Sequence, residues 1–478
     1  ASMDGFYREL SKKRREESSK SRSPFADFEG LVASGLIYEI FGQYSAAREE
    51  PIPGEELWRA AGEAADTAII IIGRATGGEE CDRRVENDYY LTPSEKRLLE
   101  LACGHFENVM AVFNCNGMVD MSCTKTCPNI KAALFMGTAG EQAAGALADF
   151  ITGRAIPSGK LSQTAALCYE DYPTAGHFSC TREDPEALLT YESYGLEREG
   201  GEKFAASPVT VYQEDIYVGY RYFDSFQKPV LYPFGFGLSY AEFDYEVFSA
   251  GINGGKAVFE VKVTNISKKF PGKEAVQLYI HGPSVRLKKP WQELRAIAKT
   301  PLLQPMESCK LILSFPLSDM ASFDEASKSY ILEPGDYVAM VGTGSHNSAP
   351  AAVLALGEKI VTRTVSADIG MTPANKGRIA LMEPEAQRRI ENIDGLPRIA
   401  FTERDVEVSR PAYGGYNHKV EPVASTLQDV AAGRVTREEF VGQMTVRELA
   451  VLCNGFGPGL PFGGRRTTIL PSVQSILP

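Results

Sequence analysis

Short apolar runs alternate with helix-like stretches over the first third of the chain. The runs occupy residues 69–72, 109–113 and 132–136, and none of them alternates with polar residues. Unbroken apolar runs of this length are typical of parallel strands that are covered on both faces. Helical patterns follow the first and third runs, over residues 94–105 and up to Ile151. The pattern predicts an α/β fold, a layered sandwich with a mainly parallel sheet.

The start of the first of these helices has its own signal. Residues 92–95 read Thr-Pro-Ser-Glu. Thr92 can cap the helix, Pro93 suits the first helical position, and Glu95 can reach back to the cap.

From about residue 241 the hydrophobic period changes to strict alternation. Residues 257–263, 275–280, 310–315 and 337–341 read as half-buried strands, and residues 334–336 read Pro-Gly-Asp, which favours a turn. Short strands at this spacing predict an immunoglobulin-like β-sandwich, in which Trp291 is interpreted as a packing anchor.

The remaining segments have weaker patterns. Residues 5–24 are polar and basic, and both a helix and a mobile arm fit them. Residues 25–66 read as helical, with Trp58 on the apolar face, whereas residues 345–425 read as an irregular linker. Two capping boxes, at residues 436–439 and 445–448, predict two short helices.

Composition narrows the class of protein. The chain has 478 residues, a formal net charge of −12 and 44% hydrophobic residues, which indicates a globular protein and argues against nucleic acid as a partner. No apolar run is long enough for a membrane span, and no signal peptide is visible.

The cysteines indicate a redox compartment. There are nine, an odd number, and Cys103, Cys115 and Cys168 lie in segments that read as core. We therefore expect reduced thiols and a cytoplasmic location. Cys115, Cys123 and Cys127 lack the paired spacing of a zinc site, so no metal is expected.

A carboxylate-rich loop directly follows the run of isoleucines. Residues 77–82 read Gly-Gly-Glu-Glu-Cys-Asp, and in α/β sheets ligands bind beyond the carboxyl ends of the strands. A carboxylic acid placed there can serve as a general acid. The alternative is a solvated acidic loop with an Asp82–Arg83 surface ion pair. The sequence has no GxGxxG and no GxxxxGK[ST], and this acidic loop would repel a phosphate, so no nucleotide cofactor is expected.

Aromatic residues and glycines are dense over residues 212–240. Two interpretations stay open: a packed connector between domains, or a surface that stacks against sugar rings.

Four ordered segments carry a resemblance to a known family. They are GGEECDR at 77–83 with DYYLTPSEKRLLE at 88–100, GTAGEQAAGALADFITGRAIPSGKL at 137–161, YQEDIYVGYRYFDSF with LYPFGFGLSY within 212–240, and residues 241–342 with GKEAVQLYI. Together they resemble glycoside hydrolase family 3, the β-glucosidase group, including its fibronectin type III-like domain.

The resemblance implies a function and a catalytic residue. It implies hydrolysis of terminal β-D-glucosyl residues with retention, with no cofactor, and it places the general acid/base on Glu79. Glu80 stands where the family usually has glycine, so the choice between the two glutamates stays open. The family's nucleophile, an Asp in an SDW-like segment of a (β/α)₈ barrel, has no counterpart in this sequence.

The same resemblance implies a domain order. We expect a polar arm at 1–24, the α/β sandwich at 25–240, a fibronectin type III-like β-sandwich at 241–345, a linker at 346–424 and a truncated lead-in to the barrel at 425–478, which is the order of the reversed-domain subgroup. The expected substrate is a β-linked glucoside or short oligosaccharide, with a homo-oligomer or second chain supplying the barrel. The alternative function is a non-catalytic carbohydrate-binding or assembly module.

Overall fold

The computed structural model describes most of the chain between residues 2 and 444. The described residues are 2–20, 49–74, 85–115, 117–137, 139–175, 192–193, 195, 211–365, 377–385, 388, 390–391, 393–408 and 425–444. They fall into two compact units. The first comprises Ala1–Lys13 and Tyr44–Pro411, and the second comprises Arg14–Gln43 and Ala412–Pro478.

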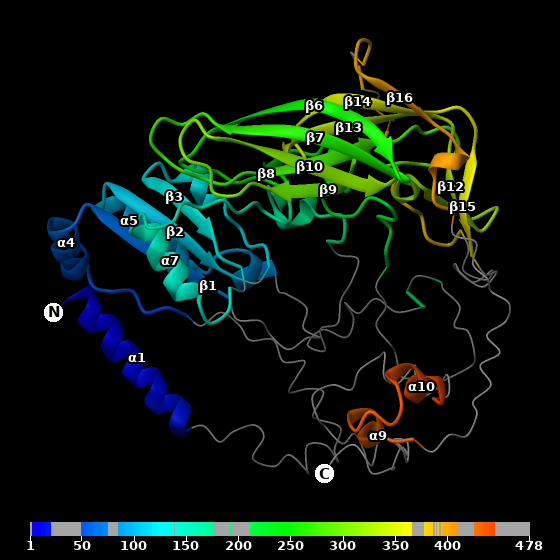
Figure 1. Cartoon of the computed structure of the whole chain (residues 1–478). Helices are drawn as coiled ribbons and strands as arrows, with labels where there is room; N and C mark the ends of the chain where they lie inside the picture. Colours follow the sequence, from blue (N-terminus) through cyan, green and yellow to red (C-terminus); the bar gives the residue numbers. More distant parts are fainter. Residues whose placement is uncertain are drawn as a thin grey trace. The chain divides into compact units, whose positions relative to one another are not determined.

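The α/β layer of the first unit is built on a parallel sheet. Its strands are β1 (Thr67–Gly73), β2 (Asn108–Asn114) and β3 (Ile130–Phe135), hydrogen-bonded in the order β1-β2-β3 (Figure 1). All pairings are parallel. The α/β class and the three strands predicted from the apolar runs are thereby confirmed, with the third strand beginning at Ile130.

One face of this sheet is covered by helices. They are α4 (Glu55–Ala64) and α5 (Pro93–His105), and Trp58 of α4, only 3% exposed, packs with Leu98 and Phe106. The predicted start of α5 is confirmed, because Thr92 and Glu95 form a reciprocal capping box. Burial of this helix face is therefore combined with a satisfied helix N-terminus.

The other face of β1 differs from the expectation. A central strand covered on both sides was expected, but among the described residues β1 pairs with β2 alone and lies at the sheet edge. Ile70 and Ile72 point toward the helices, whereas Ile69 and Ile71 are 41% and 59% exposed. A run of isoleucines has no alternation, so its sequence could not show that one face stays open.

Short elements connect the layer to the rest of the unit. They are α6 (Cys123–Thr126), α7 (Ala143–Ile151), β4 (Ala165–Ala166), the 3-10 turn Tyr169–Asp171, α8 (Tyr220–Ser225) and β5 (Val230–Tyr232). The helix predicted to end at Ile151 is confirmed as α7. Strands β4 and β5 pair antiparallel.

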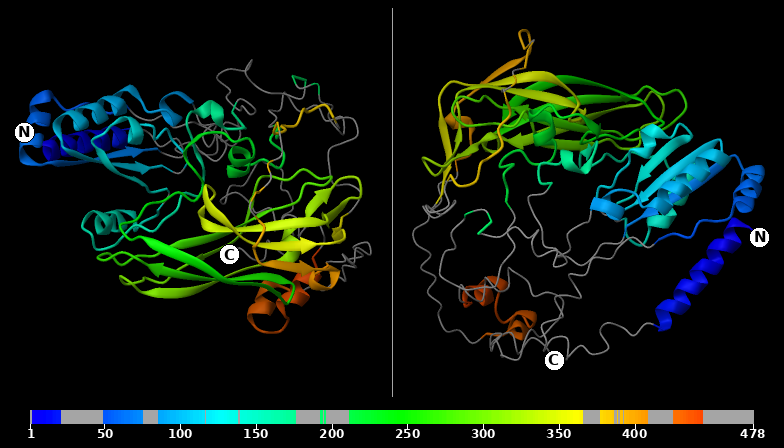
Figure 2. Two further views of the ribbon diagram at one scale, coloured as in Figure 1. Left: turned by 90° about the horizontal axis from the view of Figure 1, so that it is seen from above. Right: turned by 180° about the vertical axis from the view of Figure 1, so that it is seen from behind.

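The second half of the unit is a β-sandwich, drawn in green through yellow to orange in Figure 2. One sheet has the order β10-β7-β6 and the other the order β16-β14-β13-β8-β9. The strands are β6 (Phe243–Asn253), β7 (Lys256–Asn265), β8 (Ala275–His281), β9 (Glu293–Lys299), β10 (Ser308–Pro316), β13 (Gly335–Gly344), β14 (Asn347–Leu356) and β16 (Arg398–Phe401). Phe259, Leu278 and Leu354 are fully buried in the one core between the sheets. The predicted fold of this region is confirmed.

The prediction of an irregular linker after residue 345 is wrong for three segments, each of which forms a strand. β14 directly continues the sheet of β13, and β16 pairs with β14 in parallel. β15 (Ile360–Thr364) joins β11 (Ser322–Asp324) and β12 (Ser329–Leu332) in a small sheet. Alanine-rich and proline-containing residues such as Ala349–Ala352 carry little strand signal by themselves, and pairing with β13 orders them.

The other described segments are helical. Residues 5–24 were predicted to be either a helix or a mobile arm, and helix α1 (Met3–Lys20) covers most of them. The second unit contains α9 (Leu427–Ala431) and α10 (Arg437–Gly442), capped by Thr426 and Thr436. The box at 436–439 is confirmed, whereas residues 445–448 and 25–48 lie outside the described residues. Among the described helices, none combines the length and the apolar character needed to cross a bilayer.

Candidate active site

The predicted acid/base residue belongs to a stretch of sequence whose two flanking segments are described. Glu79, with Glu80, Asp82 and Arg83, falls in residues 75–84, outside the described residues. Both flanks of this segment are described. Arg74 directly follows β1, and the turn Val85–Tyr89 leads into Thr92 and α5.

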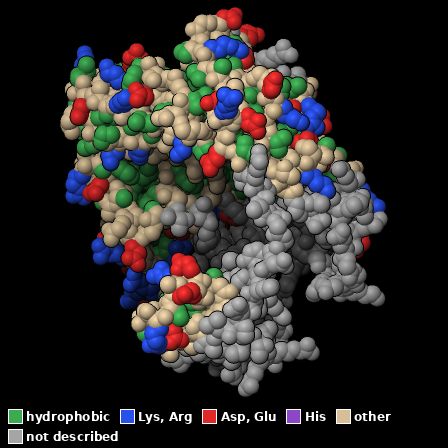
Figure 3. Space-filling model, turned by 45° about the vertical axis from the view of Figure 1, so that its right-hand side comes forward, with side chains coloured by type: hydrophobic (Ala, Val, Ile, Leu, Met, Phe, Trp, Pro, Cys, Tyr) green, Lys and Arg blue, Asp and Glu red, His purple; other side chains and the backbone are tan. Residues whose placement is uncertain are grey.

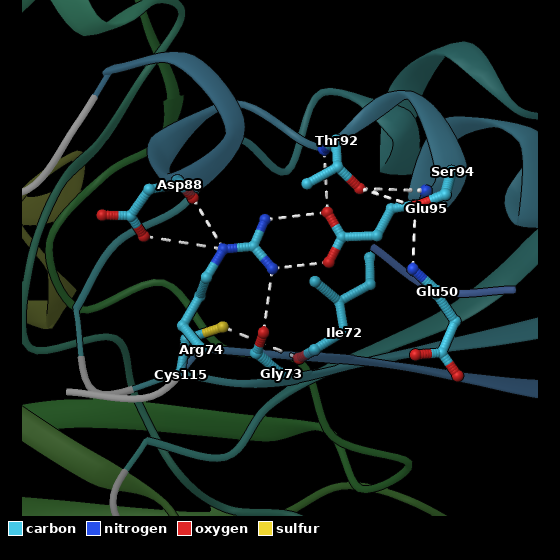
Figure 4. Close-up of polar contacts among 9 residues, drawn as sticks. All are labelled: Glu50, Ile72, Gly73, Arg74, Asp88, Thr92, Ser94, Glu95 and Cys115. Atoms are coloured by element: carbon cyan, nitrogen blue, oxygen red, sulfur yellow. Dashed lines mark hydrogen bonds and ion pairs between the residues drawn. The ribbon is translucent and has the colours of Figure 1, made fainter. Parts of the chain in front are cut away.

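Arg74 is the centre of the polar cluster (Figure 4). Its Nη1 and Nη2 atoms donate to the two carboxylate oxygens of Glu95 at 2.5 and 2.9 Å. Its Nε atom donates to the main-chain oxygen of Asp88 at 2.8 Å and lies 3.6 Å from Asp88 Oδ1. Nη1 also donates to the Gly73 oxygen at 2.8 Å. The planar guanidinium is therefore held in a fixed orientation by acceptors on several sides.

Glu95 connects this cluster to the helix. Its Oε2 atom accepts from the Thr92 N–H at 2.8 Å, while the Glu95 N–H donates to Thr92 Oγ1 at 3.2 Å. One carboxylate thus serves as both half of the capping box and the partner of Arg74. The end of β1 and the start of α5 are consequently tied together through Glu95.

The charges of the cluster are buried. The side chains of Arg74, Asp88 and Glu95 are 3%, 6% and 14% exposed. Burial disfavours the charged guanidinium, but the hydrogen bond and the charge attraction from Glu95 outweigh it, so the pKa of Arg74 is raised above its usual value. Arg74 is therefore charged at neutral pH.

The strand end is held from the neighbouring strand as well. The Arg74 N–H donates to the Asn114 oxygen at 3.1 Å, and Cys115, 1% exposed, donates its thiol to the Ile72 oxygen at 3.6 Å. Of the other cysteines expected in the core, Cys103 and Cys168 are half-buried. Among the described residues no group of three metal-ligating side chains occurs.

Aromatic residues close the other side of the turn. Asn87 adopts a left-handed φ of 63°, which an asparagine tolerates, and the chain then delivers Tyr89 into the core at 4% exposure. The Tyr89 ring packs edge-on against Tyr169 and Tyr172 at 5.3 and 6.0 Å. Burial raises the pKa of Tyr89 far above its usual value. These rings hold the turn by packing.

Sequence reasoning missed this cluster. Arg74 stands alone after an apolar strand, and Glu95 was assigned only to the cap. No local pattern joins two residues that lie 21 positions apart. The cluster is visible only in the folded chain, where Arg74 and Glu95 form a bidentate pair.

The glycine- and aromatic-rich segment behaves mainly as a packed connector. Tyr217 and Phe223 are buried, and Tyr220 stacks on Phe234 at 4.8 Å. Gly237 lies where a Cβ atom would come within 2.2 Å of the Gly159 oxygen. The close approach explains the glycine and favours the packing interpretation for this part of the segment.

Polar contacts join this connector to the β-sandwich. The Leu294 N–H donates to the Tyr220 hydroxyl at 2.7 Å. Gln292 Nε2 donates to Asp224 Oδ2 at 2.9 Å, and both side chains are buried. A buried amide–carboxylate contact fixes the connector on the sandwich because neither group has water to replace its partner.

These features define a class of protein. A parallel α/β layer with a carboxylate-rich loop beyond its first strand is followed by a fibronectin-like β-sandwich, and a packed aromatic connector joins them. This arrangement is that of a multidomain protein in which a parallel α/β layer is joined to an all-β domain.

Comparisons with known proteins give the family. Residues 55–240 match the glycosyl hydrolase family 3 C-terminal domain, and residues 274–345 match the fibronectin type III-like domain. The chain therefore belongs to glycosyl hydrolase family 3, of which it carries these two domains.

Curated relatives extend the match. The chain is 32% identical to β-glucosidase A of Butyrivibrio fibrisolvens over 85% of its own length and 53% of the relative's. It is 28% identical to a β-glucosidase of Ruminococcus albus, over 88% of this chain and 41% of the relative. The chain thus spans about half the length of the curated relatives it matches.

Solved structures agree on the fold. A β-glucosidase from Paenibacillus barengoltzii superposes with a TM-score of 0.63 at 30% identity, over 87% of this chain and 44% of that one. β-Glucosidase 3B from Thermotoga neapolitana, solved with α-D-glucose, gives a TM-score of 0.55 at 29% identity, over 70% of this chain and 45% of that one.

Proposed function

We propose that this chain is part of a retaining β-glucosidase, in which Glu79 is the general acid/base. The family match over both domains carries the proposal. The position of the loop supports it, since residues 75–84 follow directly on the carboxyl end of β1 and both flanks of the loop are anchored. Loops at this end of a parallel strand are where α/β proteins bind ligands.

The proposed mechanism has two steps. A carboxylate nucleophile attacks the anomeric carbon while Glu79 protonates the departing glycosidic oxygen. Glu79, now a carboxylate, then takes a proton from the water that hydrolyses the glycosyl–enzyme. The two carboxyl groups must lie about 5–5.5 Å apart in such a mechanism.

The proposed nucleophile comes from outside the two matched domains. The sequence has no SDW-like segment, so we propose that a barrel domain supplies the Asp. We take residues 425–478 as the lead-in to that barrel. The barrel then belongs either to a longer polypeptide or to a second chain, and mixing this chain with a separately produced barrel domain would show which arrangement restores turnover.

Leaving-group dependence tests the role of Glu79. In Glu79→Gln, turnover of methyl β-D-glucoside should fall by about 10²–10⁴-fold, because its alkoxide leaves only with a proton. Turnover of 2,4-dinitrophenyl β-D-glucoside in the first step should change little, since that phenolate leaves unaided. Equal losses on the two substrates would contradict the acid role.

Matched variants complete this experiment. Glu80→Gln decides between the two neighbouring glutamates, and Glu100→Gln, on the exposed face of α5, is the control for loss of one negative charge. Proton NMR of the first product formed tests retention, because a retaining enzyme releases β-D-glucose before it mutarotates.

The second candidate function is a non-catalytic carbohydrate-binding or assembly module. The absence of the SDW-like segment from the sequence favours it. Binding of glucose or cellobiose, measured by calorimetry on the folded chain without any turnover, would support it over catalysis.

We further propose a cytoplasmic location, a role in carbohydrate metabolism and a small β-linked glucoside as substrate. The half-buried and buried free cysteines support the location, since such thiols persist where the compartment is reducing. On the face in Figure 3, basic and acidic side chains are interspersed rather than gathered into a basic stripe, which supports the expectation that nucleic acid is not the partner. Self-association stays a proposal, which sedimentation velocity would test.

A further inference from the structure

A small pocket in the first unit is lined by basic and hydroxyl side chains. Its walls come from the end of β8, the segment that leads into β9, the end of α8 and residues 384–388. His281, Lys289 and Arg388 line it, and none of its lining residues carries a carboxylate. Its space, counted out to the open mouth, is about 290 Å³, below the range of about 300–1,000 Å³ for pockets that take drug-sized ligands. The pocket therefore suits a small ligand.

Trp291 connects the walls of this pocket. Its main-chain N–H donates to the Ser225 hydroxyl at 2.8 Å, and its main-chain oxygen accepts from His281 Nδ1 at 2.6 Å. The Arg388 guanidinium lies over its ring, 4.0 Å from the centroid. The polar groups of the pocket are consequently held in place by the fold, which lowers the entropic cost of binding a ligand there.

Arg388 keeps donors available for a ligand. A guanidinium has five N–H donors, and one of them is directed to the main-chain oxygen of Asp224 at 3.4 Å. The Asp224 carboxylate is already bound, since Gln292 Nε2 and His346 Nε2 each lie 2.9 Å from one of its oxygens. Within the described part of the chain, no acidic side chain forms an ion pair with Arg388. Its charge is oriented by the Trp291 ring and is left for another partner.

Lys289 adds a buried positive charge to the pocket lining. Its side chain is 4% exposed, and its Nζ atom donates to Ser322 Oγ at 2.6 Å. Glu333 lies 4.0 Å away, at the limit of an ion pair, and its carboxylate also accepts from the N–H groups of Arg286 and Leu287 at 2.9 and 3.2 Å. Burial lowers the pKa of Lys289, which the Glu333 charge opposes. A buried ammonium with so distant a counter-charge is stabilised by a second anion.

The groups around the pocket decide the class of ligand. A sugar ring would need an open aromatic face, but Arg388 covers the Trp291 ring, and the His281 ring packs against it at 4.7 Å. A metal cation would meet two positive charges and no carboxylate in the lining. An anion with several acceptor oxygens matches a planar guanidinium, an ammonium and a hydroxyl group.

We propose that this pocket binds a phosphate group, with Arg388 and Lys289 as its charged ligands and Ser284 as a hydroxyl donor. The site belongs to the β-sandwich and the end of the connector, and it is independent of the function proposed for Glu79. The chain would thus carry an anion site outside the α/β layer.

Fluorescence of Trp291 tests the proposal directly, because this residue lies in the pocket wall. In Trp58→Phe, Trp291 is the one remaining tryptophan, and titration with inorganic phosphate should change its emission saturably. Potassium chloride at the same ionic strength should not. Arg388→Gln should weaken phosphate binding by at least about tenfold, because charge-assisted hydrogen bonds are lost. A response that does not saturate, or an unchanged affinity in Arg388→Gln, would overturn the proposal.

Two further variants control for charge and for aromatic stacking. Arg363→Gln is the matched control, since Arg363 is also exposed and lies over an aromatic ring, 6.0 Å from the Tyr330 centroid, outside the pocket. It should leave the affinity for phosphate unchanged. Arg388→Lys keeps the charge without the planar fork, so its affinity should fall between wild type and Arg388→Gln. Calorimetry does not depend on the surroundings of the indole and should give the same order. The reverse order would contradict the site.

Glucose 6-phosphate distinguishes a free ion from a phosphate group carried by a sugar. Binding at least about tenfold tighter than that of inorganic phosphate would assign the pocket to a sugar-borne phosphate. Equal affinity would assign it to the free ion. Glucose without phosphate should leave the Trp291 emission unchanged, and glucose that binds there as tightly as glucose 6-phosphate would overturn the assignment.

Discussion

The β-sandwich and the α/β layer reach order in different ways. In the sandwich, both sheets contribute fully buried residues such as Phe259, Leu278 and Leu354 to one continuous core. Each such side chain stabilises the fold by about 1.5–3 kcal/mol relative to an exposed one. The sandwich is therefore held chiefly by nonspecific apolar burial between two complete sheets.

The α/β layer has a smaller and more divided interior. Its buried apolar residues form separate clusters, one around Phe113 and one around Trp58. On the other side of β1, Ile69 and Ile71 are exposed, and α7 has no buried residue. Specific polar contacts contribute more to the stability of this layer, namely the helix cap at Thr92 and the ion pair of Arg74 with Glu95.

This difference predicts that the two regions respond differently to loss of a single polar contact. A domain held by a continuous core tolerates loss of any one polar contact, whereas a layer held by a buried charge cluster responds locally to each change in it. The layer that carries the candidate loop is the one in which single side chains determine geometry. The buried hydrogen bond between Gln292 and Asp224 joins the connector to the sandwich.

The largest expected effect is in the sandwich core. Phe259→Ala should lower the free energy of unfolding of this region by about 3–5 kcal/mol, because it leaves a cavity at a fully buried site. Ile71→Ala, at a site in β1 that is 59% exposed, should change the free energy of unfolding of the α/β layer by less than about 1 kcal/mol.

The chain's two tryptophans make this measurement regional. Trp58 lies in the α/β layer, and Trp291 borders the sandwich. Urea unfolding followed by fluorescence in Trp58→Phe and Trp291→Phe backgrounds reports one region at a time. Equal destabilisation of both signals by Phe259→Ala would show that the two regions unfold as one and would break the comparison.

An intermediate effect is expected at the cap of α5. Thr92→Ala removes the acceptor for the Glu95 N–H and should cost about 1 kcal/mol, seen in the Trp58 signal. Thr92→Ser keeps the hydroxyl and should restore most of the loss. A cost below a few tenths would mean that the Arg74–Glu95 pair alone fixes the helix start.

The smallest effect is a pH dependence of the sandwich. Burial lowers the pKa of His281 below its usual value and the Arg388 charge adds to this, although the Trp291 carbonyl oxygen acts the other way. The unfolded imidazole then takes a proton, near its ordinary pKa of about 6.5, more readily than the folded one. Stability should be full above that pH and fall as the pH drops toward 5.

His281→Asn checks this assignment. The asparagine amide can replace the Nδ1–H that faces the Trp291 oxygen at 2.6 Å, but it cannot titrate. The midpoint of thermal unfolding should therefore vary less between pH 7.5 and 5 in the variant than in the wild type. An identical pH dependence in both would contradict the role of His281.

Much of the fold was predictable because it follows from periodicity. Unbroken apolar runs predicted β1, β2 and β3, and alternation predicted β7, β8, β10 and β13 of the sandwich. The capping box at Thr92 was visible because its members lie three residues apart. The loop with Glu79 was found from composition and resemblance, which identify residue types and order along the chain.

Only the tertiary structure decided the rest. Strands β14 to β16 have weak patterns of their own. β14 is ordered by pairing with the adjacent strand β13, and β15 and β16 are ordered by pairing with strands farther away in sequence. The exposure of Ile71 depends on which elements cover β1, and the partnership of Arg74 with Glu95 and Asp88 depends on three segments meeting. Local sequence determines propensity and period, whereas burial and long-range pairing exist only once the chain has folded.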